Sequence, residues 1–214
     1  QGYLKHIKES FSTDTLLKDI DSLSDLRVMV VGDLILDEYC YCRVSGTVSK
    51  WPVLSAIYQD IHQMAGAGAA IARHVKQFAQ EVLYVSTVGD RDDSHAFAAR
   101  LLEEEDIKCQ WFTWPDTFTV TKRRYITGGY PNPLARDVHL GKREPDTRLF
   151  EIGFMPELPL PTTIEMEICT YLEQIAPTYD LVILADFGHG LVSPRVAETV
   201  AAHSQWWAVN AQTN

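Results

Sequence analysis

Nearly continuous apolar runs recur at four places along this chain. They cover residues 27–31, 82–85, 181–185 and 207–209. A strand that is buried on both faces has this pattern, and such strands occur in parallel sheets that are covered by helices. The runs therefore predict four strands of one central, parallel sheet.

Segments with a helical spacing of apolar residues lie between these runs. They predict helices over 66–79, after Asp92 or Asp93, from Thr162 or Thr163, and after Ser193 and Pro194. Strands that alternate with helices predict an α/β fold with a doubly wound, mostly parallel sheet. A short helix capped by Ser12 or Thr13 predicts an N-terminal helical extension over 1–26, which leaves 27–214 for the α/β domain.

Residues 39–60 differ from the four runs. They alternate between apolar and polar positions and are broken by Gly46 and Pro52. This pattern predicts two or three antiparallel strands that form a small β flap outside the main sheet. We expect strands from 107–126 to join this flap as a lid. Residues 127–147 are rich in glycine, proline and charge, which predicts a loop.

Composition and charge exclude some functions. The chain has 214 residues, of which 46% are hydrophobic, and its net charge is −10. An acidic chain repels a phosphate backbone, so we expect no nucleic-acid partner. We expect no membrane partner either, because the chain has no signal peptide and no apolar run near the roughly 20 residues that span a bilayer. Its four cysteines lack the spacing of a zinc site, which predicts buried thiols in a reducing, cytoplasmic setting.

Polar residues end all four apolar runs. These residues are Gly32 with Asp33, Gly89 with Asp90, Asp186 and Asn210. The carboxyl ends of parallel strands meet at one edge of a sheet, and α/β proteins bind ligands there. Each residue alone is equally typical of a chain turn, but their coincidence predicts a ligand-binding edge.

Further polar or small residues could serve this edge. Asp37 offers a carboxylate that accepts hydrogen bonds from sugar hydroxyls. Gly66 and Ala67 would let a ligand approach backbone N–H groups, or they allow a helix to pack tightly on the sheet. Lys122 and Arg124 alternate onto one strand face, where they would clamp a phosphate or face solvent.

A second glycine-rich segment, Asp-Phe-Gly-His-Gly, follows the third run. Its glycines permit close approach of a phosphate, and His189 is either a phosphate ligand or a solvent-facing loop residue. The glycines near residue 66 are not a dinucleotide-binding fingerprint, because Ile71 stands where a third small residue is required.

Taken in order, these segments resemble those of the PfkB/ribokinase family of carbohydrate kinases. The matching segments are 31–37, 49–56, 65–72, 88–90, 119–124, 149–151, 185–190 and 209–214. The resemblance runs from 27 to 214, corresponds to the N-terminal two-thirds of such a kinase, and is strongest to heptose-phosphate kinase-type modules. It departs from the family at Ala67, where the family has glycine, and in the lack of an asparagine between His62 and Val75.

The resemblance implies transfer of the γ-phosphoryl group of ATP, with Mg²⁺, to a hydroxyl of a sugar or sugar phosphate. It implies substrate binding by Asp33, Asp37, Gly66, Ala67, Lys122 and Arg124, and ATP binding by Asp186 and Asn210. In such kinases the flap often joins two chains, so we expect a homodimer formed through the flap strands.

The family carries its catalytic base in a Gly-Ala-Gly-Asp motif. Here the Gly-Ala-Gly of residues 66–68 is followed by Ala69, so we expect no catalytic residue and no metal ligand in this chain, and a missing C-terminal part. Loss of a general base lowers activity by about 10²–10⁴-fold, so we expect negligible kinase activity from the chain alone. The alternative is a non-catalytic, kinase-like interaction module or subunit.

Overall fold

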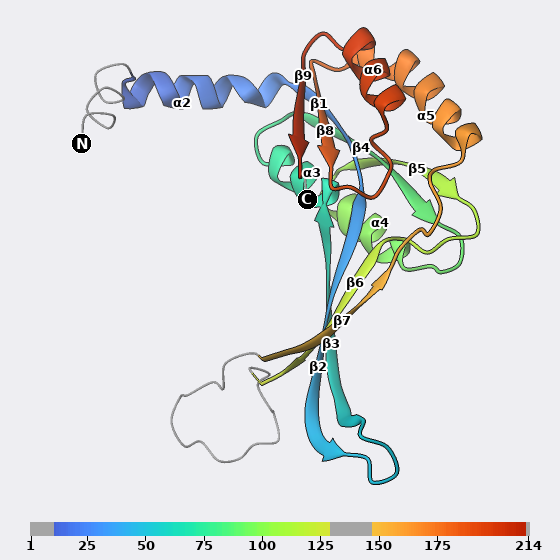
Figure 1. Cartoon of the computed structure of the whole chain (residues 1–214). Helices are drawn as coiled ribbons and strands as arrows, with labels where there is room; N and C mark the ends of the chain where they lie inside the picture. Colours follow the sequence, from blue (N-terminus) through green and yellow to red (C-terminus); the bar gives the residue numbers. More distant parts are fainter. Residues whose placement is uncertain (1–10, 129–146, 213–214) are drawn as a thin grey trace, which may run out of the picture.

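The computed structural model describes residues 11–128 and 147–212. These residues form a helix-covered main sheet and a separate lid sheet that extends away from it (Figure 1). The loop predicted for 127–147 lies almost entirely outside the described residues.

The main sheet is parallel throughout and has the strand order β5-β4-β1-β8-β9. Its strands are β1 (Arg27–Gly32), β4 (Glu81–Gly89), β5 (Lys108–Trp114), β8 (Leu181–Asp186) and β9 (Trp207–Ala211). All four apolar runs are strands of this sheet, and the predicted α/β fold is confirmed. The run at 207–209 is not buried as predicted, because β9 lies at an edge of the sheet and all five of its residues are exposed.

Helices cover both faces of this sheet. They are α3 (Gly68–Lys76), α4 (His95–Glu104), α5 (Thr162–Ile175) and α6 (Pro194–His203). Val28 and Val30 of β1 pack in one core with residues of α3 and α4, whereas Met29 and Val31 pack in a second core with residues of α5 and α6. Because both faces are covered, every position of the run is apolar.

The lid sheet has the strand order β3-β2-β6-β7. Its strands are β2 (Leu34–Thr47), β3 (Leu54–Ala67), β6 (Thr121–Thr127) and β7 (Thr147–Phe154). The antiparallel β2–β3 hairpin confirms the flap predicted for 39–60, but both strands reach back to the main sheet. This reach brings residues of β2 and β3 to the ligand-binding edge.

Two predicted boundaries are wrong. Residues 107–113 do not join the lid, because β5 pairs in parallel with β4 at an edge of the main sheet. An edge strand is only partly covered, so β5 is mostly half-buried and lacks the continuous apolar run of the central strands. The helix predicted from residue 66 begins at Gly68, because Gly66 and Ala67 are the last residues of β3.

The N-terminal extension contains helix α2 (Thr13–Ser22), which projects from the body of the molecule (Figure 1). Ser12, rather than Thr13, is its cap, since the Ser12 hydroxyl accepts a hydrogen bond from the Thr15 N–H at 3.0 Å. Across the described ranges, no helix has both the length and the apolar character needed to cross a bilayer.

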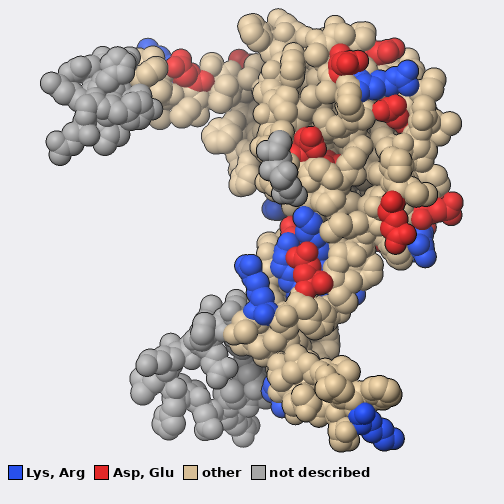
Figure 2. Space-filling view, in the orientation of Figure 1, with Lys and Arg blue, Asp and Glu red and all other residues tan. Residues whose placement is uncertain are grey.

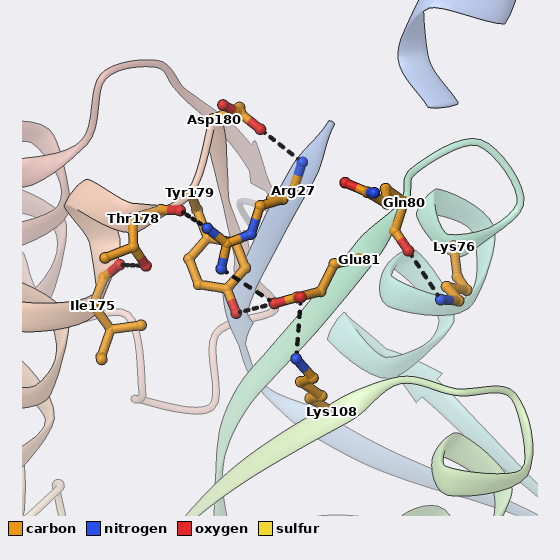
Figure 3. A network of polar contacts seen from close by, with 9 residues as sticks. All are labelled: Arg27, Lys76, Gln80, Glu81, Lys108, Ile175, Thr178, Tyr179 and Asp180. Carbon is orange, nitrogen blue, oxygen red and sulfur yellow. Dashed lines mark hydrogen bonds and ion pairs between the residues drawn. The ribbon is translucent and has the colours of Figure 1, made fainter. Parts of the chain in front are cut away.

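Polar groups at the amino ends of the main strands are paired with one another (Figure 3). The Glu81 carboxylate accepts a hydrogen bond from the Tyr179 hydroxyl at 2.9 Å. Glu81 also forms ion pairs with Lys108 at 3.0 Å and Arg27 at 3.5 Å, and the contact with Lys108 is the largest cause that lowers the Glu81 pKa. The Arg27 N–H donates to the Asp180 carboxylate at 2.7 Å. The polar groups at the amino edge of the sheet thus bind one another. We therefore expect a ligand site at the carboxyl edge.

Candidate functional site

Asp37 lies on β2 where the lid leaves the main sheet. Its partners in the strand register are Met64 on β3 and Lys122 on β6. An ideal Cβ at Gly66 would lie 2.6 Å from an Asp37 carboxylate oxygen, so glycine is the residue that leaves this carboxylate its place. Gly66 was predicted to let a ligand approach. In the structure, its lack of a side chain leaves space for the Asp37 carboxylate.

Arg124 orients the Asp37 carboxylate. Its guanidinium is ion-paired with Asp37 through Nη1, and its Nε lies 2.8 Å from a carboxylate oxygen of Glu151 on β7. The hydrogen bond to Asp37 is the largest cause that raises the Arg124 pKa. Arg124 is thus ion-paired with two carboxylates. Lys122, on the same strand face, forms no ion pair with any described residue. Figure 2 shows acidic and basic side chains gathered where the lid joins the body.

Arg123 points to the opposite lid face, as the alternation of β6 predicts. Its Nε lies 2.5 Å from the Glu38 carboxylate, which also accepts a hydrogen bond from the Gln63 amide at 2.8 Å. Glu38 is buried. This network joins β2, β3 and β6, and it does not include the residues of the Asp37 face.

Asp33 ends β1 and is only 2% exposed. Its carboxylate accepts hydrogen bonds from three backbone N–H groups of the loop after β8: Phe187 at 2.9 Å, His189 at 3.2 Å and Leu191 at 3.2 Å. Burial raises the Asp33 pKa, and these three bonds lower it. Asp33 therefore holds a loop.

The expectation that Asp33 contacts substrate is at odds with this environment. β1 lies between β4 and β8, so the residue at its end is enclosed, and the loop after β8 folds back over it. From the sequence, Asp33 and Asp37 look equally accessible. Only the tertiary structure shows that residues 187–191 fold over Asp33 and bind its carboxylate.

The loop after β8 carries His189. Gly188 and Gly190 on either side have φ of +77° and +96°, a backbone region that favours glycine. The His189 Nε2 is buried and finds no hydrogen-bond partner among the described residues. Burial is the largest cause that lowers the His189 pKa; Asp33 and Asp186 act to raise it, and Lys122 acts to lower it. The charge of Lys122, on the lid face, therefore acts on this loop.

Asp186 and Asn210 lie at the carboxyl ends of the neighbouring strands β8 and β9. Asn210 pairs with Ala185 in the strand register, and it is exposed. The Asp186 carboxylate accepts a hydrogen bond from the Gly188 N–H at 2.9 Å. The carboxyl ends of β8 and β9 therefore carry polar side chains at one edge of the parallel sheet. Within the ranges described, no group of three or more His, Cys, Asp or Glu side chains could hold a metal ion.

Ala67 connects β3 to α3 with φ of +53° and ψ of −126°. This left-handed φ is strained for a residue with a Cβ. The resemblance drawn from the sequence has glycine at this position. The conformation explains that preference without requiring a ligand at residue 67.

A separate cavity of about 330 Å³ lies beyond the end of β5. Its lining includes Trp114, Phe118, Met155 and several prolines, and its cation, Arg91, stacks over the Phe118 ring at 4.5 Å. The lining is mostly apolar. This cavity is less suited to a polyol than the face that carries Asp37 and Lys122.

Replacement of Asp33 by asparagine is expected to lower the free energy of unfolding by about 1–3 kcal/mol. An amide has one acceptor oxygen, so it cannot serve all three loop N–H groups. Asp90, exposed at the end of β4, gives a matched control in which Asp90→Asn has little effect. Urea denaturation of both variants measures the difference, and equal stabilities would contradict the anchoring role.

The strain at Ala67 predicts that Ala67→Gly raises the free energy of unfolding by about 1 kcal/mol. The same change at Ala69, inside α3, is expected to destabilise the protein, because glycine is unfavourable in a helix. Thermal unfolding of the pair checks this opposite behaviour. A lower melting temperature for Ala67→Gly would show that the backbone at this position is not strained.

Comparison with known proteins relates this chain to carbohydrate kinases. No family model matches the chain. The Bifunctional protein HldE of Bradyrhizobium diazoefficiens is 27% identical over 189 residues, which cover 85% of this chain and 35% of that protein. HldE of Edwardsiella ictaluri is 28% identical over 175 residues, covering 80% and 32%. The chain thus spans about a third of the length of the curated relatives it matches.

Solved structures show the fold. Phosphofructokinase-2 from Escherichia coli in complex with fructose-6-phosphate aligns with a TM-score of 0.55 and 11% identity, over 88% of this chain and 56% of that one. A Staphylococcus aureus protein assigned as a phosphofructokinase aligns with a TM-score of 0.59 and 13% identity, over 88% and 54%. The resemblance stated for residues 27–214 is confirmed: the chain has the ribokinase-like fold of the PfkB-type sugar kinases, and its sequence is similar to that of the HldE proteins.

Proposed function

We propose that this chain supplies the sugar-binding part of an ATP-dependent carbohydrate kinase, and that its ligand is a sugar or sugar phosphate. The observation that carries the proposal is the Asp37 carboxylate, held by Arg124 on the lid face at the carboxyl edge of the sheet. A fixed carboxylate is suited to accept hydrogen bonds from adjacent hydroxyls. HldE and the phosphofructokinases provide independent support from sequence and fold.

Each site residue has a distinct proposed role. Asp37 orients the sugar, and Gly66 preserves the position of its carboxylate. Lys122, which lacks a carboxylate partner among the described residues, binds the phosphate of the ligand, and Arg124 acts mainly by holding Asp37. The lid sheet that carries this face would shield the reacting hydroxyl from water.

ATP and Mg²⁺ are the proposed cofactors. Exposed Asn210 and the half-buried Asp186, with two glycines of positive φ between β8 and α6, leave room for nucleotide phosphates. When bound, ATP with Mg²⁺ supplies the γ-phosphoryl group and neutralises its charge. The four cysteines, all without disulfide partners, support the proposal of a reducing, cytoplasmic location.

Isothermal titration with fructose 6-phosphate tests the sugar site, with fructose as the probe that lacks the phosphate. We expect a dissociation constant of about 1–100 µM for the phosphate ester. Asp37→Asn should weaken binding about tenfold or more, because the hydroxyls lose a charged acceptor. Asp14→Asn, on the projecting helix α2, is the control.

Equal affinity of the wild-type protein and Asp37→Asn would contradict the role of Asp37. Addition of ATP and Mg²⁺ to the same samples tests the expectation of negligible turnover, since release of ADP would contradict it.

The second face of the lid supports a dimer of this chain. Tyr58, Phe150 and Ile152 share this face with Arg123, and they are 61%, 53% and 42% exposed. Cys40, Cys42, Ala56, Tyr58, Ile61 and Tyr125 line a groove of about 390 Å³ together with Arg123. An exposed apolar sheet face of this kind is typical of a protein interface.

Sedimentation velocity is expected to give a mass near twice the 24.2 kDa of one chain. Tyr58→Glu should shift the protein to monomer, because the new carboxylate would be buried in the apolar contact. Phe78→Glu, at an aromatic position after α3 that is 52% exposed, is the control and should remain dimeric. A monomeric wild-type protein would rule out the lid dimer.

The second candidate function is a non-catalytic interaction module. It is favoured by β9, an edge strand on which all five residues are exposed. No binding of fructose 6-phosphate or ATP, together with a stable complex with another protein, would select this alternative.

A further inference from the structure

His189 is held more firmly than a solvent-facing loop histidine. Its own N–H and those of Phe187 and Leu191 donate to the single Asp33 carboxylate. Flanking glycines at 188 and 190 allow the loop to turn sharply on both sides. The buried Asp33 carboxylate, directly after β1, therefore holds this loop in place.

Charged groups from three elements act on the imidazole. Asp33 lies at the end of β1, Asp186 at the end of β8, and Lys122 on β6 of the lid. The buried Nε2 has no hydrogen-bond partner in the parts of the chain that are described, and Lys122 has no ion-pair partner there. The unpaired ring nitrogen and the unpaired ammonium, whose charge acts on the imidazole, together suit a ligand with oxygen acceptors and negative charge.

We propose that His189 and Lys122 together bind a phosphate group of the ligand, and that Asp33 positions His189 for this contact. This inference rests on the proposed function and adds a residue that bridges the lid and the main sheet. Lys122 provides a permanent charge, and His189 provides a charge that depends on pH.

The sign of the pH dependence follows from the surroundings of His189. Burial and Lys122 lower its pKa below the ordinary value, so the neutral imidazole prevails at pH 7 without a ligand. A bound phosphate favours the protonated imidazole and raises this pKa. Binding therefore takes up a proton, and the contribution of His189 to affinity increases as the pH falls.

Three proteins separate this effect from titration of the phosphate itself. A phosphate ester also titrates near pH 6, but it does so equally for the wild-type protein, His189→Lys and His189→Gln. Lysine keeps a positive charge at every pH used, and glutamine never carries one. The ratio of two dissociation constants at one pH therefore isolates the charge on residue 189.

Titrations with fructose 6-phosphate at pH 8 and pH 6 give the expected results. At pH 8, His189→Lys should bind about tenfold more tightly than the wild-type protein, and at pH 6 the two should be about equal. His189→Gln should be about tenfold weaker than the wild-type protein at pH 6. Ratios that do not change with pH, or a glutamine variant that binds like the wild-type protein, would overturn the proposal.

NMR titration of the wild-type imidazole gives a second readout that needs no variant to fold. The His189 pKa should rise when the protein is saturated with inorganic phosphate, and an unchanged pKa would overturn the proposal. Titration with ADP distinguishes a nucleotide phosphate from a sugar phosphate, because the ligand that loses more affinity in His189→Gln is the one whose phosphate His189 contacts.

Asp33→Asn tests the positioning role. Removal of the carboxylate should lower the His189 pKa further and move the pH dependence of binding to lower pH. A purely structural Asp33 would lower stability and leave that pH dependence unchanged.

Failure of this inference differs from failure of the proposed function. If fructose 6-phosphate binds no better than inorganic phosphate and Asp37→Asn has no effect, the sugar site fails while the His189 contact stands. If binding depends on Asp37 but not on His189, only this inference fails.

Discussion

One buried carboxylate organises the carboxyl edge of this protein. Asp33 closes β1 in the middle of the main sheet and gathers three N–H groups from a loop more than 150 residues away in sequence. Its own carbonyl accepts a hydrogen bond from Gly68, where α3 begins. β1, the first turn of α3 and the loop after β8 are thereby fixed to one another, and the site is assembled around a residue that is itself concealed.

The two faces of the lid sheet carry different charge pairings. On one face, Arg123 and the buried Glu38 form a closed pair that joins strands. On the other, Arg124 is shared between Asp37 and Glu151, and Lys122 remains without a described carboxylate partner. Adjacent residues of β6 therefore point to different faces: Arg123 pairs with Glu38 across strands, and Lys122 and Arg124 lie on the face that we propose binds the ligand.

The sequence predicted the strands that are buried on both faces of the sheet better than the strands that are covered only in part. Residues 28–31 must be apolar at every position because helices cover both faces, so this part of the main sheet was predictable. β5 is covered on part of its surface only and was mistaken for a lid strand. Asp186 was predicted as a site residue from its position at a strand end, and Lys122 from the alternation of its strand. Glu151 was missed, because its partnership with Arg124 depends on the β6–β7 register, which no local pattern reveals.

The geometry of the hairpin has a mechanical consequence. β2 and β3 have 14 residues each and leave the body side by side, with the Gly68 N–H and the Asp33 carbonyl joining their roots at 3.0 Å. A strand of that length spans roughly 46 Å, so a tilt of about 5° at the root would carry the tip through roughly 4 Å. The hairpin is thus a lever whose fulcrum lies beside Asp33, and small adjustments around a ligand would be magnified at its far end.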